Sequence, residues 1–453
     1  MTASIIFGKN FSIKNLNRIY TDRIMGSGAI GLDRIRPDRL SSDILSEVSL
    51  ISKKYNNGSY KFTAYKQKLV SKGVDSNPRQ ISIPTARDRI TLRAICDSLA
   101  ELFPNAKLKV PQEVISSLNE AIKSKIYSEY IKIDLKNFYP SIPHELIKES
   151  IKYKIRKKET RDIILKAIET PTVSSQVGRN NTENLKKGVP QGLSISNILA
   201  EISLNKIDDD ILKTPNIWYR RYVDDILILT KSGQASDICH TIINKLESIG
   251  LKPHPLEEGS KTVVSTFIND FSFLGYRIST DNIFIKNESI LRFESSIAKI
   301  LTAYKYATSK TLLDKERALE YCKWKLNLRI TGCIFDGKRF GWAAYFSQIS
   351  TTSQLRSLNH VIAKMLERFG LHEKIKVKSL IKTFYELHRS DKNKYRYIPN
   401  FDNLTIDQRK DILSLWLGKE KVNTLTDDYI VNMFNKKISI SVRELEEDIS
   451  GIS

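Results

Sequence analysis

The pattern of apolar and polar residues predicts strands in the middle of the chain. Apolar residues at every second position predict a short strand at 80–84 that ends at Pro84, and another at 130–139 that is broken by Pro140. Residues 218–230 predict a hairpin with two acids at its turn, and 271–279 with 282–286 predict a second hairpin. The central region is therefore expected to contain an antiparallel sheet.

Helical spacing of apolar residues surrounds these strands. It predicts helices at 86–103, 144–158, 194–213 and 234–249, the last of which closes at Gly250. Residues 38–72 indicate helix or loop, and the pattern becomes mainly helical after 287, with a loop near 331–341. We therefore expect an α+β part over 80–286 and a largely α-helical part over 290–453.

Length and composition exclude several classes of protein. With 453 residues, the chain is longer than one core usually serves, so two or three domains are expected. No stretch of 18 apolar residues predicts a transmembrane helix, and the first twenty residues lack the pattern of a secretory signal, so we expect a cytoplasmic protein without a membrane partner. The four cysteines are scattered and no HExxH pattern occurs, which argues against a zinc site.

The net charge of the chain suggests the kind of partner that it binds. Lys and Arg total 73 against 51 acids, a net charge of +22. A protein this basic commonly binds a polyanion such as nucleic acid, although a solvated, highly charged surface gives the same composition.

Three acids are candidates for metal binding. Asp224 and Asp225 occupy the predicted hairpin turn, and Asp134 lies in the strand predicted at 130–139. If the three carboxylates converge, their repulsion requires a cation, and two Mg²⁺ ions are the usual solution in phosphoryl transfer. The acidic run at 208–210 is interpreted instead as a solvated helix end, because no hairpin frames it.

The surrounding motifs resemble those of reverse transcriptases, in the order of that family. The resemblance rests on RQISIPTARDRITLRAI (79–95), IKIDLKNFYPSI (131–142), GVPQGLSISNILAEI (188–202), RYVDDILIL (221–229), IGLKPHPLEEGSKT (249–262) and FSFLGYRI (271–278). It implies a right-hand polymerase with an N-terminal extension and the start of the fingers at 1–78, fingers and palm at 79–286, and a helical thumb and extension at 287–453. It also implies DNA synthesis from deoxynucleotides, with an RNA template or structured RNA and a DNA product as partners.

The resemblance implies roles for individual residues. Asp134, Asp224 and Asp225 would bind two Mg²⁺ ions, and Lys261 would donate a proton to pyrophosphate, although a solvated surface lysine is an equal alternative. Arg79 and Lys72 would contact the triphosphate. Tyr139 would exclude a ribose 2′-hydroxyl, with an ordinary core aromatic as the alternative, while Gln191 and Gly192 would lie beside the incoming base and template.

Two basic segments are weaker candidates for nucleic-acid binding. One contains Lys154, Arg156, Lys157 and Lys158, and the other contains Lys338 and Arg339 beside Phe340 and Trp342. A solvated basic face explains the first nearly as well, and a packed aromatic loop explains the second slightly better.

Within the motif at 188–202, residues 191–196 read QGLSIS. This variant is similar to the one in bacterial abortive-infection and defence-associated reverse transcriptases. A retron or group II intron enzyme, an RNA-dependent RNA polymerase and a non-catalytic RNA-binding scaffold are the alternatives. The sequence leaves open whether synthesis uses a template, what primes it, and whether the chain forms a homo-oligomer.

Overall fold

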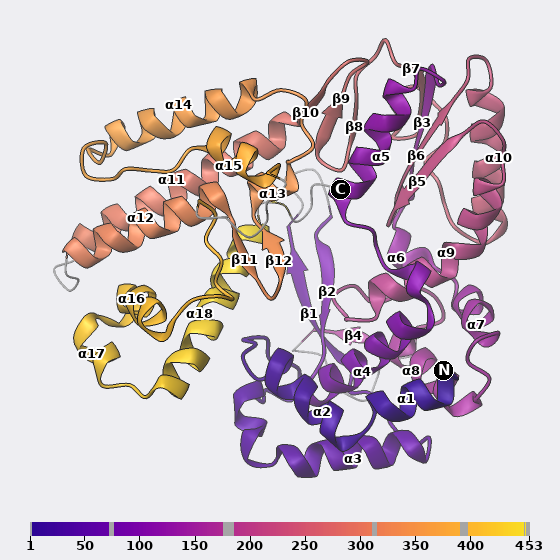
Figure 1. Ribbon diagram of the computed structural model, residues 1–453. Coiled ribbons are helices and arrows are strands. Elements are labelled where there is room, and N and C mark those ends of the chain that lie inside the picture. Colours follow the sequence, from indigo (N-terminus) through magenta and orange to yellow (C-terminus); the bar gives the residue numbers. More distant parts are fainter. Residues whose placement is uncertain are drawn as a thin grey trace. The chain divides into compact units, whose positions relative to one another are not determined.

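The computed structural model describes residues 2–71, 77–174, 185–309, 315–389, 397–447 and 449. The chain divides into two compact units (Figure 1). The first contains Met1–Lys109 and Ile126–Thr266, and the second contains Val110–Lys125 and Phe267–Ser453. The second unit therefore takes one helix, α5 (Pro111–Lys123), from within the sequence span of the first.

A four-stranded antiparallel sheet is the centre of the first unit, with strand order β5-β6-β3-β7. Its strands are β3 (Glu129–Asp134), β5 (Trp218–Tyr222), β6 (Asp225–Thr230) and β7 (Val263–Thr266). Every residue of β6 is buried, which explains its nearly continuous apolar sequence. Helices α9 (Ser196–Leu212) and α10 (Ala235–Ser248) pack against the sheet.

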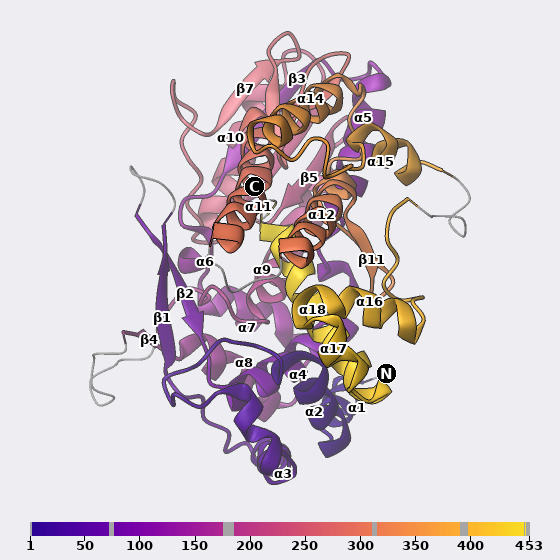
Figure 2. The ribbon, with the colours of Figure 1, turned by 90° about the vertical axis from the view of Figure 1, so that its left-hand side faces the viewer.

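A second sheet in the same unit has the order β2-β1-β4. Strands β1 (Tyr65–Val70) and β2 (Arg79–Ile83) pair antiparallel, and Figure 2 shows β4 (Thr172–Val173) beside β1, which it joins in parallel. The remaining helices of this unit are α1 (Ala3–Asn10), α2 (Ile13–Ile19), α3 (Ile44–Asn56), α4 (Ala86–Leu102), α6 (Phe138–Ser141), α7 (His144–Lys152) and α8 (Lys158–Glu169), with short helical turns at Tyr20–Ile24, Pro37–Ser42 and Pro104–Ala106.

Helix α4 begins where the sequence predicts because its first turn is capped. Thr85 is the N-cap, and its hydroxyl accepts a hydrogen bond from the amide of Asp88. The buried Asp88 carboxylate in turn accepts hydrogen bonds from the Tyr60 hydroxyl at 2.9 Å and the Thr63 amide at 3.1 Å. These contacts attach the start of the helix to the segment that leads into β1.

The second unit is mainly helical, as predicted. Its helices, besides α5, are α11 (Asn287–Ser309), α12 (Lys315–Thr331), α13 (Trp342–Tyr345), α14 (Ser353–Arg368), α15 (Leu380–Leu387), α16 (Ile406–Leu417), α17 (Lys419–Asn423) and α18 (Asp427–Glu447). Its strands are β8 (Phe271–Phe273), β9 (Tyr276–Ile278), β10 (Ile283–Ile285), β11 (Cys333–Phe335) and β12 (Lys338–Phe340). In the described ranges, every helix is too short or too polar to span a bilayer.

The α+β prediction is confirmed, but several element boundaries were wrong. The strand predicted at 130–139 ends at Asp134, because Asn137 has a positive φ of 47° and helix α6 follows. The helix predicted at 144–158 is two helices, α7 and α8, separated at 153–157. The hairpin at 271–286 has three short strands, β8 to β10, and the loop near 331–341 contains the hairpin β11–β12. The region 38–72, predicted as helix or loop, also contains strand β1. The last residues of this strand are exposed and do not alternate between apolar and polar, so the pattern gave no signal for a strand.

Candidate active site

The register of the four-stranded sheet brings two of the predicted acids together. Strands β3 and β6 are antiparallel, with Asp134 directly opposite Asp225. Side chains at directly opposed positions lie on the same face of a sheet. The two carboxylates, about ninety residues apart in sequence, are therefore cross-strand neighbours at one end of the sheet.

Asp224 lies in the turn that joins β5 and β6. Tyr222 pairs with Asp225, so the hairpin loop has two residues, Val223 and Asp224. Val223 has a positive φ of 57°, which is unfavourable for a β-branched residue and is normally a glycine conformation in such turns. Backbone strain of this kind persists only where surrounding contacts enforce it, and it is common at functional sites.

Arg221 supplies such a contact. Its guanidinium donates a hydrogen bond to the Val223 carbonyl at 2.9 Å. It also forms ion pairs with Glu201 at 2.8 Å and Asp208 at 2.6 Å, both on α9. The Arg221 side chain is only 3% exposed, and although burial lowers its pKa, the two carboxylates raise it overall. The turn is thus bonded to helix α9 through a buried, fully charged arginine.

Asp134 is held by basic groups from the segment before β7. Its carboxylate is 3.3 Å from Lys261 Nζ and 3.7 Å from His254 Nε2. The backbone amide of His254 donates to the Asp134 carbonyl at 2.9 Å, which fixes this segment along the end of β3. Burial lowers the pKa of His254 more than the Asp134 charge raises it, so His254 is mainly neutral at pH 7.

Asp225 is the most buried of the three acids, at 9% exposure. Its Oδ1 is buried without a hydrogen bond and lies 3.5 Å from Lys132 Nζ. The Asp225 pKa is raised to about 6, mainly by burial; the attraction of Lys132 opposes this increase, and the charges of Asp224 and Asp134 add to it. This carboxylate is held in a site where a negative charge is unfavourable.

The Asp224 carboxyl is less buried and close to positive charge. Burial raises its pKa, as does Asp134, while Arg79 and Lys261 lower it. Arg79 begins β2 and is exposed, so its guanidinium is available to a ligand near Asp224. The structure therefore brings Arg79 and Lys261 to the same end of the sheet as the acids. Lys72 lies outside the described residues.

Tyr139 lies on α6, directly after the end of β3. Its hydroxyl donates to Asn197 Oδ1 at 2.7 Å, and burial together with the Asp224 and Glu201 charges raises its pKa. Tyr139 is half-buried, whereas the neighbouring Phe138 is buried in the core. Asn197, on the first turn of α9, thus holds the ring of Tyr139 in place.

The loop before α9 carries the remaining predicted residues. The Gln191 carbonyl accepts a hydrogen bond from the Ser82 amide at 2.7 Å, which joins the loop to β2. Gly192 has a φ of 98°, and a Cβ there would lie 2.7 Å from Ile81 Cγ2 and 3.0 Å from the Ser82 carbonyl. Glycine is therefore required by the close approach of the two backbones.

The structure corrects one prediction about a charge cluster and supports the packed-loop alternative for another. Asp208 is not a solvated helix end, because it accepts hydrogen bonds from Arg221 and from the Tyr219 hydroxyl at 2.6 Å. In the other cluster, Trp342 is completely buried and packs against Phe293, so it is not available to stack on a nucleobase. Lys338 and Arg339 are exposed on β12 of the second unit.

Sequence reasoning missed several residues that contact the predicted site. Asn197, Lys132 and His254 each contact a candidate residue, and Arg221 contacts Val223 in the turn that carries Asp224. Each lies within or next to a quoted motif, but its contacts depend on elements distant in sequence. Among the described residues, no group of three or more His, Cys, Asp or Glu side chains is arranged to hold a metal ion.

The region that carries this geometry matches a known family. Residues 66–278 match the model for the reverse transcriptase (RNA-dependent DNA polymerase) domain. The chain carries a reverse transcriptase domain. The predicted resemblance to reverse transcriptases is thereby confirmed for this region.

Curated relatives share this region at low identity. The chain is 27% identical over 190 residues to the putative COX1/OXI3 intron 2 protein of Saccharomyces cerevisiae, covering 40% of this chain and 21% of that protein. It is 20% identical over 305 residues to the Escherichia coli protein YkfC, covering 56% and 76%. It is 25% identical over 144 residues to Protein P of a duck hepatitis B virus, covering 32% and 15%. The chain thus spans about a fifth of the length of the yeast relative.

Among solved structures, the chain is similar to telomerase from Candida albicans in complex with a fragment of telomeric RNA. The TM-score is 0.44 at 16% sequence identity, covering 89% of this chain and 67% of that one.

Proposed function

We propose that this protein is a reverse transcriptase-type DNA polymerase that adds deoxynucleotides to a 3′-end by two-metal phosphoryl transfer. The observation that carries the proposal is the cross-strand pairing of Asp134 with Asp225, with Asp224 in the adjoining turn. This places three carboxylates at one end of a sheet inside a reverse transcriptase domain.

The donor set fits Mg²⁺, which prefers carboxylate oxygens. Asp225 Oδ1 is a buried acceptor without a hydrogen bond, and Asp134 faces it from the next strand. Lysine ammonium groups already lie 3.3 Å from Asp134 and 3.5 Å from Asp225, so this end of the sheet attracts cations. Among the described residues these three side chains are not yet grouped as a metal site. On binding, Asp134, Asp224 and Asp225 would hold two Mg²⁺ ions, which would activate the attacking 3′-oxygen and neutralise the leaving pyrophosphate.

The basic residues around the acids suit the triphosphate of an incoming nucleotide. Arg79 is exposed and electrostatically coupled to Asp224, and its planar guanidinium can donate two hydrogen bonds to a phosphate. The Lys261 side chain is 66% exposed and forms its ion pair with Asp134 at the edge of the site. Lys261 would therefore be able to protonate the departing pyrophosphate.

Tyr139 would select deoxynucleotides over ribonucleotides. Its ring is fixed by the hydrogen bond to Asn197, and it is close enough to Asp224 for that carboxylate to raise the Tyr139 pKa. A ring held there would leave no room for a 2′-hydroxyl on the sugar of a bound nucleotide. Gln191 and Gly192, joined to β2, would then border the base and the template.

The experiment is primer extension with labelled dNTPs and Mg²⁺, comparing the wild type with Asp134→Asn and Asp224→Asn. Each substitution should reduce incorporation at least about a hundredfold, because the loss of one metal-binding carboxylate removes transition-state stabilisation. Asp209→Asn is the matched control, since Asp209 is an exposed acid on α9. Equal activity in all four proteins would refute the assignment of the site.

We further propose that the enzyme acts in antiphage defence of the abortive-infection type, in the bacterial cytoplasm, as a homo-oligomer. Support comes from the QGLSIS variant at 191–196 and the helical second unit. The named similarity to a fungal intron protein favours the alternative, an enzyme that copies an RNA template. Treatment of the purified protein with RNase before the assay separates templated from untemplated synthesis: loss of incorporation indicates a bound RNA template, and retained incorporation indicates untemplated extension.

A further inference from the structure

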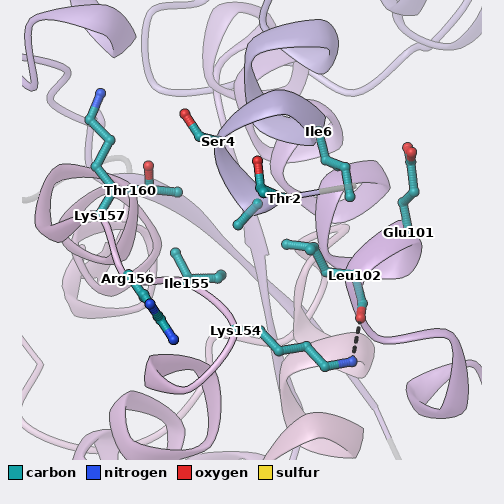
Figure 3. Close-up of a pocket in the computed structure, with 11 residues that line it drawn as sticks. Thr2, Ser4, Ile6, Glu101, Leu102, Lys154, Ile155, Arg156, Lys157 and Thr160 are labelled. Atoms are coloured by element: carbon teal, nitrogen blue, oxygen red, sulfur yellow. Dashed lines mark hydrogen bonds between the residues drawn. The ribbon is translucent and has the colours of Figure 1, made fainter.

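The first unit contains a second candidate ligand site, formed by the basic segment between α7 and α8. A cavity of about 680 Å³ is lined by this segment, by the start of α1 and by the end of α4 (Figure 3). Its lining includes Lys154, Arg156 and Lys157, but not Lys158. The structure thus gathers three of the four cations from this segment around one cavity.

We propose that this cavity binds a nucleoside 5′-phosphate, either as a free nucleotide or as the 5′-terminal nucleotide of a strand. The inference does not depend on the polymerase activity, because the site is formed by different residues. Its volume is within the range of about 300–1,000 Å³ that is typical of small-molecule sites.

Positive charge in the lining exceeds negative charge. Arg156 and Lys157 are exposed, and within the described part of the chain neither forms an ion pair. Lys154 also lines the cavity and donates a hydrogen bond to the Leu102 carbonyl at 2.7 Å (Figure 3). The acidic residue of the lining, Glu101, is 3.5 Å from Lys9 and is therefore partly neutralised.

Two helices begin at the same cavity. Thr2 is the N-cap of α1 and Lys157 is the N-cap of α8, and neither makes a side-chain capping hydrogen bond. The first amide groups of a helix have no partner within it, and the positive end of the helix dipole favours an anion. The two helix starts thus add to the three cations, and together they suit a phosphate group.

The rest of the lining suits a nucleoside. Ile6, Leu102 and Ile155 form an apolar part of the lining, and Leu102, the most exposed of the three at 9%, is the one that a base could contact. Figure 3 shows Thr2 and Ser4 of α1 across from the segment that carries Arg156 and Lys157. Their hydroxyl groups are hydrogen-bond partners for a sugar or a phosphate.

The test measures equilibrium binding in EDTA, which prevents polymerisation. The probes are AMP and a labelled single-stranded RNA decamer with either a 5′-phosphate or a 5′-hydroxyl. The wild type should bind the 5′-phosphorylated decamer about tenfold or more tightly than the 5′-hydroxyl form, because hydrogen bonds to a charged group are strong. Binding of AMP as well indicates a free-nucleotide site, and binding of the decamer alone indicates a strand-end site.

Three variants decide whether the cavity is responsible. Arg156→Gln combined with Lys157→Gln should abolish the preference for the 5′-phosphate, and Ser4→Trp should weaken binding by obstructing the cavity without a change of charge. Lys148→Gln combined with Lys152→Gln is the control, because it removes the same charge from exposed lysines of α7 that lie outside the lining. Thermal unfolding checks that each variant is folded.

The inference is wrong if the wild type neither binds AMP nor prefers the 5′-phosphorylated decamer, or if that binding or preference survives the Arg156 and Lys157 substitutions. If the Lys148 and Lys152 control loses the preference for the 5′-phosphate to the same extent, the preference is only a general effect of charge. That result would also overturn the inference. None of these results bears on the Asp134 and Asp224 variants, so failure here and failure of the polymerase proposal are distinguishable.

Discussion

The Asp225 carboxylate should destabilise the metal-free protein, although the proposed activity requires it. The change that tests this is Asp225→Asn, which keeps the size of the side chain and removes its charge. Burial raises the Asp225 pKa from 3.8 to about 6, so the folded protein binds this proton more tightly than the unfolded chain does. Stability therefore falls as the pH rises from about 4 to about 6, and stays lower above that range.

The magnitude follows from the two pKa values. They differ by about 2 pH units, and each unit corresponds to about 1.4 kcal/mol. Ionised Asp225 should therefore lower the free energy of unfolding by about 3 kcal/mol at pH 8, and by about 1 kcal/mol at pH 4.5. The attraction of Lys132 is already included, because it acts on the same pKa. The Asp225→Asn protein should be more stable than the wild type by up to these amounts.

The assay is urea denaturation of both proteins in EDTA at pH 8 and pH 4.5. Asp209→Asn is the matched control, since it removes an equal charge from an exposed position and should change stability by less than about 0.5 kcal/mol at both pH values. A less stable Asp225→Asn protein at pH 8, or a gain that does not shrink in acid, would refute the reasoning.

Three further substitutions test the architecture around the site. Arg221→Gln should lower the free energy of unfolding by about 3–5 kcal/mol in urea denaturation, because two partly buried carboxylates lose their partner. Substitution of its half-buried neighbour, Arg220→Gln, should cost less than about 1 kcal/mol. Tyr139→Val should increase the ratio of ribonucleotide to deoxynucleotide incorporation about tenfold or more in a primer-extension assay, whereas an unchanged ratio would exclude Tyr139 as the residue that selects the sugar. Gly192→Ala should cost about 1–3 kcal/mol more than Gly233→Ala, because both have positive φ but only Gly192 has neighbours within 4 Å of a Cβ; equal costs would contradict the role of crowding.

Local pattern was sufficient for much of the fold. The fully buried strand β6, the hairpin turn at Val223 and Asp224, and helices α4, α9 and α10 lie within a few residues of their predicted positions. These elements have strong periodicity or a clear boundary signal such as Thr85 before α4. The prediction failed where local signals were weak, as at β1, or where a conformation was set by one residue, as at Asn137.

The sequence by itself determined which residue types form the candidate site, because the acids, the aromatic residue and the basic residues all lie in recognisable motifs. Only the tertiary structure decided their surroundings: the burial that raises the Asp225 pKa, the hydrogen bond from Tyr139 to Asn197, and the contact between Arg221 and the Val223 carbonyl. The physical reason is distance along the chain. Periodicity reports on neighbours a few positions away, whereas burial, charge interaction and the cavity beside Arg156 arise from segments that meet only after folding.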